Sequence, residues 1–186
     1  STSEQSEETA VNVPQFDADS AYLYVKNQVD FGPRVPNTKE HVACGNYLAG
    51  QLEAFGAQVT NQYADLIAYD GTLLKARNII GSYKPESKKR IALFAHWDTR
   101  PWADNDPDEK NHNTPILGAN DGASGVGALL EIARLVNQQQ PELGIDIILL
   151  DAEDYGAPQF YTGQHKEEFW CLGSQLSLIH ISEPTR

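Results

Sequence analysis

The sequence predicts an α/β fold in which a mixed, mostly parallel sheet carries helices on both faces. Residues 91–95 and 145–150 form short apolar runs, which are typical of strands buried on both sides. Between these runs, residues 123–139 place apolar side chains three and four positions apart, which is the period of an α-helix. A strand, a helix and a second strand in this order form the basic unit of a parallel sheet.

Two helices and a hairpin are expected before this unit. The expected elements are helices over residues 17–29 and 38–55 and strands over residues 57–68 and 73–82. Asn37 or Thr38 can cap the second helix, and Gly56 lies just past its end, where glycine commonly stops a helix. Residues 69–72 provide the turn between the two strands. Residues 97–117 are expected to form a long loop, and loops of this length in compact domains are usually functional or disordered.

Length and composition fit one domain and exclude some functions. The chain has 186 residues, and its 40% hydrophobic content is enough for a core. No apolar run reaches the roughly 18 residues that a transmembrane helix needs. The net charge of −12 argues against nucleic acid as a partner, because nucleic acid requires a basic surface. The oligomeric state is not predicted.

The two ends of the chain differ in composition from its middle. Residues 1–9 contain only Ser, Thr, Glu and Gln, so we expect residues 1–14 to be a disordered leader. Such a leader resembles the tether of an exported, periplasmic or lipid-anchored bacterial enzyme, although a trimmed start explains it equally well. Residues 177–186 resemble a translated sequencing adapter, so residues 176–186 are expected to be foreign and not to continue the preceding helix. Residues 15–175 would then be the N-terminal part of one incomplete catalytic domain.

Acidic residues and a histidine stand where the predicted elements begin or end. His96 and Asp98 follow one apolar strand, Asp121 precedes the helix, and Glu153 and Asp154 follow the second strand. Alone, each has an ordinary explanation as a strand end, a helix N-cap or a solvated pair of acids. Such element ends meet at one edge of an open sheet, where ligands bind in α/β proteins. Imidazole and carboxylate groups are ligands of zinc, so the combination predicts a zinc site.

The neighbouring acids Glu153 and Asp154 can divide two tasks between them. One would bind the metal while the other, free of it, would transfer protons. Burial raises the pKa of a carboxyl group toward neutrality, which suits a general acid–base.

Three motifs together resemble the superfamily of zinc aminopeptidases and glutaminyl cyclases. They are AHWDTRPWADND at 95–106, GANDGASG at 118–125 and LDAED at 150–154. The first motif, with FGPRVP at 31–36 and WCLGSQ at 170–175, is similar to bacterial glutaminyl cyclases related to the animal enzymes. The resemblance covers roughly residues 15–175 and implies the zinc-exopeptidase fold with zinc as cofactor.

The resemblance also implies a role for each site residue. Asp121 and Asp154 would be zinc ligands, and Glu153 would be the general acid–base. His96 would ligate only a second zinc, which Asp121 would then bridge. The side chains expected in a second shell or in the pocket wall are His96, Asp98, Trp102 and Trp170. A later zinc-binding histidine and a later aspartate of the family have no counterpart in this sequence.

The implied activity is cyclisation of an N-terminal glutamine to pyroglutamate with release of ammonia, and the partners are peptides that bear such a residue. A two-zinc aminopeptidase shares nearly every motif and is the alternative within this class. The alternative of another class is an inactive fragment, and we expect this chain to bind zinc weakly and to be nearly inactive as an enzyme. His112 and His165 are expected to be solvated and not to be metal ligands. Cys44 and Cys171 can form a disulfide or remain two separate thiols.

Overall fold

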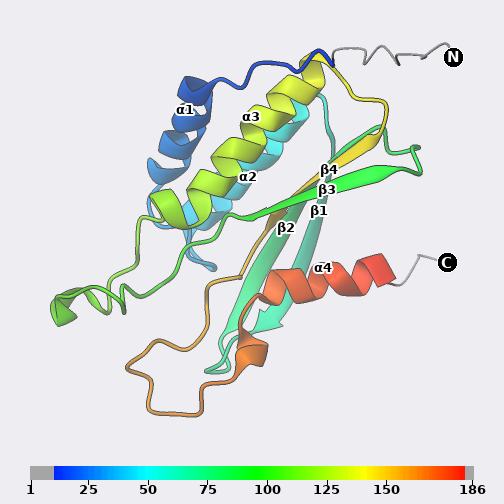
Figure 1. The fold of residues 1–186 in the computed structure, drawn as a ribbon. Helices are drawn as coiled ribbons and strands as arrows, with labels where there is room; N and C mark the ends of the chain where they lie inside the picture. The colour runs from blue at the N-terminus through cyan, green and yellow to red at the C-terminus, as the bar shows by residue number, and fades with distance from the viewer. Residues whose placement is uncertain (1–10, 183–186) are drawn as a thin grey trace, which may run out of the picture.

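A computed structural model describes residues 11–182 as a four-stranded sheet with helices on both faces (Figure 1). The strands are β1 (Gln58–Ile67), β2 (Leu73–Tyr83), β3 (Arg90–His96) and β4 (Gly144–Leu150). The helices are α1 (Ala18–Val29), α2 (Lys39–Ala54), α3 (Gly125–Gln138) and α4 (Leu172–Ser182). The sequence therefore predicted the type and approximate bounds of each strand and of α1, α2 and α3.

The prediction that the sheet is mostly parallel is wrong for the described strands. The strand order is β1-β2-β4-β3, and only the pairing of β3 with β4 is parallel. β2 is antiparallel to β1 because a tight turn connects the two strands. β4 then enters beside β2 in the opposite direction, which makes a second antiparallel pairing. The hairpin thus contributes its second strand to the middle of the sheet.

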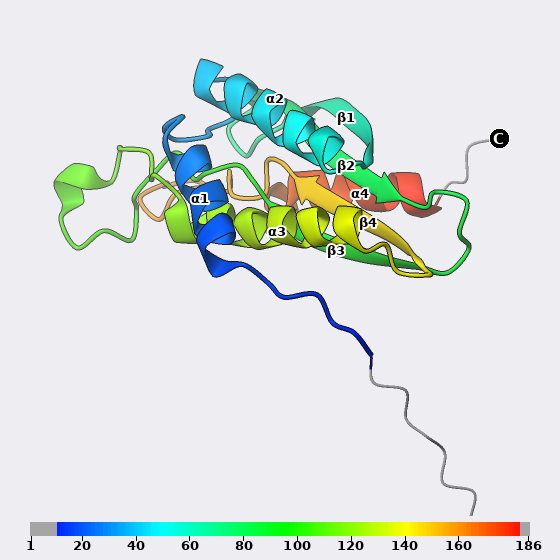
Figure 2. The ribbon, with the colours of Figure 1, turned by 90° about the horizontal axis from the view of Figure 1, so that it is seen from above.

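Helices cover the two faces of this sheet unequally. α2 and α3 pack on one face, and α1 lies against α3 (Figure 2). α4 lies on the other face, where Leu172 packs with Leu74 and Ala76 of β2. Thr38, one of the two predicted caps of the second helix, accepts a hydrogen bond at the start of α2. Asp17, which was not predicted as a cap, does so at the start of α1.

The C-terminal helix differs from the expectation for residues 176–186. α4 runs from Leu172 to Ser182, so the helix continues into the segment that was expected to interrupt it. Leu172 and Ser177 are buried, and this packing extends the helix through a sequence with little amphipathic pattern. Residues 1–10 and 183–186 lie outside the described part of the chain. Most of the predicted leader and the end of the predicted foreign tail are therefore not described.

Two further expectations concern the described residues. None of the described helices is long and apolar enough to cross a bilayer. Cys44 is a buried free thiol and Cys171 is an exposed free thiol, so the alternative of a disulfide between them is not realised.

Candidate active site

The parallel pair β3 and β4 places the predicted site residues at one edge of the sheet. His96 is the last residue of β3 and lies opposite Leu150, the last residue of β4. Asp98 follows β3 directly, and residues 151–154 follow β4 directly. The segment Ala119–Ser124, which leads into α3, lies against the end of β3. Three distant segments are therefore adjacent because two parallel strands end together.

Glycines let the segment before α3 approach the strand ends closely. Gly118 and Gly122 have φ angles of 59° and 99°, a region that other residues rarely adopt. A Cβ atom on Gly122 would lie 3.0 Å from the carbonyl oxygen of Asp98. Asp121 lies between these glycines, and its Oδ1 is 3.0 Å from Nε2 of His96. The glycine pattern thus positions Asp121 beside the end of β3.

Asp98 connects the segment after β3 to the segment after β4. Its side chain is fully buried, and its Oδ2 accepts hydrogen bonds from the amides of Glu153 at 3.1 Å and Asp154 at 3.2 Å. Its Oδ1 lies 3.4 Å from Nδ1 of His96. Burial disfavours the charged His96 ring, but Asp98 and Asp121 outweigh it and raise the pKa of His96 to about 9. In the metal-free protein, His96 therefore carries a positive charge between two carboxylates at neutral pH.

Glu153 is a buried carboxyl group with incomplete hydrogen bonding. Its residue is 9% exposed, and its Oε1 accepts a hydrogen bond from the hydroxyl of Ser174. Its Oε2 is buried with no hydrogen-bond partner among the described residues. Burial raises the pKa of Glu153, and the Ser174 bond opposes the rise only in part. A carboxyl group with a raised pKa is better suited than an ordinary glutamate to accept and donate a proton.

Asp154 lies beside a guanidinium group. Burial raises the pKa of Asp154 to about 6, while the positive charge of Arg100 opposes the rise. Nη1 of Arg100 is 3.4 Å from Oδ1 of Asp154. Arg100 is held by two bonds to Asp104, at 2.7 and 2.6 Å, and its guanidinium lies 4.9 Å from the ring centre of Trp170.

A polar cavity of about 300 Å³ brings some of the predicted residues together. Asp121, Asp154 and Trp170 line it, as do Arg100, Asp104 and the exposed His165. Glu153, the residue before Asp154, is not among the lining residues.

The other predicted pocket residues lie away from this cavity lining. Trp102 packs against Tyr69 and Tyr155, and the guanidinium of Arg100 is 5.6 Å from its ring centre. His112, which was expected to be solvated, is partly buried, and its Nε2 donates a hydrogen bond to the carbonyl oxygen of Asp106 at 2.8 Å.

Several residues that support the site were not predicted. Arg100 and Ser174 stand in the motifs 95–106 and 170–175, so their motif membership was a signal. His41 of α2 had no signal. Its Nε2 lies 2.9 and 2.8 Å from the two carboxylate oxygens of Asp151, the first residue after β4. Both side chains are almost fully buried, so this pair anchors the start of segment 151–154.

The donor atoms at the site match zinc in type but form an incomplete set. Carboxylates from Asp121 and Asp154 line the cavity, and His96 adds an imidazole. Within residues 11–182, no group of three His, Cys, Asp or Glu side chains is placed to hold a metal ion. Since a zinc site in a protein requires three or four protein ligands, the described chain supplies part of one.

Comparisons with known proteins bear on the same segments. Residues 78–184 match the model of peptidase family M28. The structure of a glutaminyl cyclase from Bacteroides thetaiotaomicron, bound to N-acetylhistamine, is 94% identical with a TM-score of 0.88, and the match covers 89% of this chain and 56% of that one. A leucine aminopeptidase precursor from the same organism is 93% identical with a TM-score of 0.89, over 90% of this chain and 58% of that one.

Two less similar proteins are named as an exopeptidase and an aminopeptidase. A Zn-dependent exopeptidase from Parabacteroides distasonis is 61% identical with a TM-score of 0.90, over 93% of this chain and 59% of that one. Aminopeptidase YwaD of Bacillus subtilis is 28% identical over 95% of this chain and 33% of its own length. The chain therefore spans little more than half the length of the solved structures and about a third of this curated relative.

Proposed function

Because the chain belongs to peptidase family M28, we propose that it carries the first part of a zinc-dependent glutaminyl-peptide cyclotransferase. The proposed reaction converts the N-terminal glutamine of a peptide to pyroglutamate and releases ammonia. The observation that supports it most directly is the 94% identity to a glutaminyl cyclase over 89% of this chain. Peptides with an N-terminal glutamine are the proposed substrates.

The proposed roles follow the positions of the side chains. Asp121 and Asp154 line the polar cavity and would be two of the zinc ligands. Zinc, when bound, would act as a Lewis acid toward the carboxamide carbonyl. His96 would remain beside Asp121 and would ligate only a second metal ion.

Glu153 would transfer the proton that the reaction moves. It would accept a proton as the α-amine of the glutamine attacks the side-chain carboxamide carbon, and it would donate that proton to the departing ammonia. Its raised pKa and its unpartnered buried oxygen suit this exchange. Both reacting groups belong to one residue, so holding the glutamine in a folded conformation supplies much of the rate advantage. Trp170 at the cavity wall is proposed to help hold it.

A two-zinc aminopeptidase is the second candidate. Its support is the 93% identity to a leucine aminopeptidase precursor, together with the contact between His96 and Asp121 at 3.0 Å. In that case His96 would be a ligand of the second zinc, and the products would be free amino acids.

The two candidates differ in product, so one assay separates them. The chain, loaded with zinc, is incubated with a glutaminyl peptide while ammonia and free amino acids are both measured. We expect slow ammonia release, because the described residues provide an incomplete zinc site. Release of amino acids without ammonia would favour the aminopeptidase. If neither ammonia nor free amino acids form above the uncatalysed level, a catalytic role for this chain is refuted.

Variants then test the residue roles. Glu153→Gln should lower ammonia release about 10²- to 10⁴-fold, the range expected for loss of a general acid–base, and should leave zinc affinity unchanged. Asp154→Asn should weaken zinc binding, measured by competition with a chromophoric chelator. Glu142→Gln removes an exposed carboxylate near the start of β4 and serves as the control. If Glu153→Gln matches this control, the proposed role of Glu153 is wrong.

A further inference from the structure

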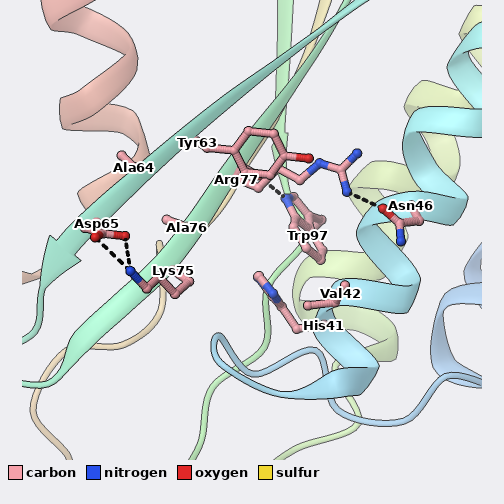
Figure 3. A pocket seen from close by; sticks show the side chains of 10 residues that line it. All are labelled: His41, Val42, Asn46, Tyr63, Ala64, Asp65, Lys75, Ala76, Arg77 and Trp97. Carbon is pink, nitrogen blue, oxygen red and sulfur yellow. Dashed lines mark hydrogen bonds and ion pairs between the residues drawn. The ribbon is translucent and has the colours of Figure 1, made fainter.

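A second cavity, of about 400 Å³, lies between α2 and the hairpin of β1 and β2 (Figure 3). Its lining contains none of the candidate zinc ligands and not Glu153, although it includes His41, which anchors segment 151–154. The lining is mostly apolar with a few charged groups. The residues that the argument uses are His41 and Val42 of α2, Tyr63 of β1, and Ala76 and Arg77 of β2. A cavity of this size, largely apolar with a few placed polar groups, is typical of small-molecule sites.

Arg77 is a buried cation without a carboxylate partner. The residue is 8% exposed, and its guanidinium donates to two neutral side chains, Asn61 and Asn46, each at 2.8 Å. No carboxylate of the described residues lies within the ion-pair distance of 4.0 Å from its nitrogens. This is notable in a chain with a net charge of −12. Burial of an unpaired charge is costly, and an arginine fork is well matched to a planar carboxylate.

The other charged groups at this cavity are already compensated. Asp65 and Lys75 pair with each other at 2.8 Å on the exposed side of the hairpin. The Asp151 carboxylate is hydrogen-bonded to Nε2 of His41 and to the backbone amide of Arg77, and it makes no ion pair with the Arg77 guanidinium. Arg77 is therefore a cation of the cavity lining without a carboxylate partner among the described residues, and a ligand with one negative charge would pair with it.

The remaining wall is suited to an apolar body. The ring of His41, which lines the cavity, is stacked on Trp97 with 4.3 Å between ring centres. Val42 and Ala76 add aliphatic surface on the two sides. The exposed Tyr63 ring covers the guanidinium of Arg77 with 5.3 Å between them, so a planar group can stack beside it.

We propose that this cavity is a binding site for a small organic carboxylate. The carboxylate pairs with the guanidinium of Arg77, and the apolar body lies against Val42, Ala76 and the ring of His41. The proposal is independent of the cyclotransferase activity, because no residue of the site around Asp121 and Asp154 takes part.

Benzoate is a suitable probe because it joins a planar carboxylate to a flat apolar ring. The chain is freed of metal with EDTA, so that benzoate cannot bind zinc, and binding is followed by NMR titration and calorimetry. We expect one benzoate per chain, with amide shifts centred on Val42, Ala76 and Arg77. Benzyl alcohol, which has the same ring without the charge, should bind at least about tenfold more weakly. Equal binding of the two compounds would overturn the assignment of the anion to Arg77.

Two variants with matched controls locate the site. Arg77→Gln should weaken benzoate binding at least about tenfold, whereas Lys88→Gln, which removes an exposed cation elsewhere, should not change it. Because Arg77 also links β1 to α2, a thermal melt checks that the variant is folded. Val42→Glu places a negative charge at the cavity wall without removing a hydrogen bond of the fold, and it should abolish binding that Val42→Gln retains. Benzoate binding that is absent in the wild type, or unchanged in both Arg77→Gln and Val42→Glu, would refute the proposal.

Discussion

Replacing His41 with leucine should destabilise the protein strongly, although position 41 lies on a helix far in sequence from the site. His41 is the side-chain partner of the Asp151 carboxylate, at 2.9 and 2.8 Å, and the two side chains are 4% and 0% exposed. Leucine preserves the helix and much of the apolar contact with Trp97. The variant therefore removes mainly the polar partner of a buried carboxylate.

The expected loss in the free energy of unfolding depends on the hydrogen bonds that Asp151 keeps in the variant. Removing the hydrogen-bond partner of a buried polar group typically costs about 1–3 kcal/mol, and the cost is larger for a charged group than for a neutral one. Asp151 retains hydrogen bonds from the amides of Arg77 and Ala152, each at 2.7 Å, which limit the loss. We therefore expect about 3 kcal/mol. This is a large part of the roughly 5–15 kcal/mol by which a domain is stable.

Urea unfolding followed by circular dichroism measures the effect. With a slope of about 1–3 kcal/mol per molar urea, the midpoint should fall by about 1–3 M. The matched control is Lys75→Met, which breaks the ion pair with Asp65 at the same 2.8 Å distance but with both side chains more than half exposed. That change should cost less than about 1 kcal/mol.

The comparison of the two variants decides the point. If His41→Leu lowers the free energy of unfolding by no more than Lys75→Met does, burial does not determine the strength of the His41–Asp151 contact. The inference that α2 anchors the segment after β4 would then be wrong.

Three further predictions concern thiols, acid stability and close packing. Burial raises the pKa of the Cys44 thiol to about 12, so a thiol reagent should label Cys171 in the native protein and Cys44 only after unfolding; fast labelling of both would contradict the structure. Arg134 lowers the pKa of Glu131, so this pair stabilises the fold above the unfolded pKa of about 4.3 and the contribution is lost as pH falls through the lower, folded value. Glu131→Gln should therefore lower the urea midpoint more at pH 7 than at pH 3, and an equal loss would refute the pairing. A Cβ atom on Gly173 would lie 2.1 Å from the backbone oxygen of Asp151, just after β4. Gly173→Ala should therefore lower the free energy of unfolding by about 1–3 kcal/mol in the same assay. Unchanged stability would contradict that packing.

The local patterns of the sequence were sufficient to find most elements. The period of apolar residues predicted α3, and the turn at 69–72 predicted the hairpin, because both signals depend on residues a few positions apart. The same patterns did not reveal the strand order. Whether β4 pairs with β1, β2 or β3 depends on contacts between distant segments, and a common βαβ pattern favoured a mostly parallel sheet that the hairpin does not allow.

The sequence by itself determined where the site residues stand along the chain, since His96, Asp121 and Glu153 each mark the end or beginning of an element. It also carried the glycine pattern that admits Asp121 to the edge of the sheet. Only the tertiary structure decided which partners these residues meet. Arg100 reaches Asp154 across 54 positions and His41 reaches Asp151 across 110, and such contacts follow from packing α2 and the loops onto the sheet. The same packing places the Arg77 guanidinium against the side chains of Asn61 and Asn46, with no carboxylate of the described residues within ion-pair distance.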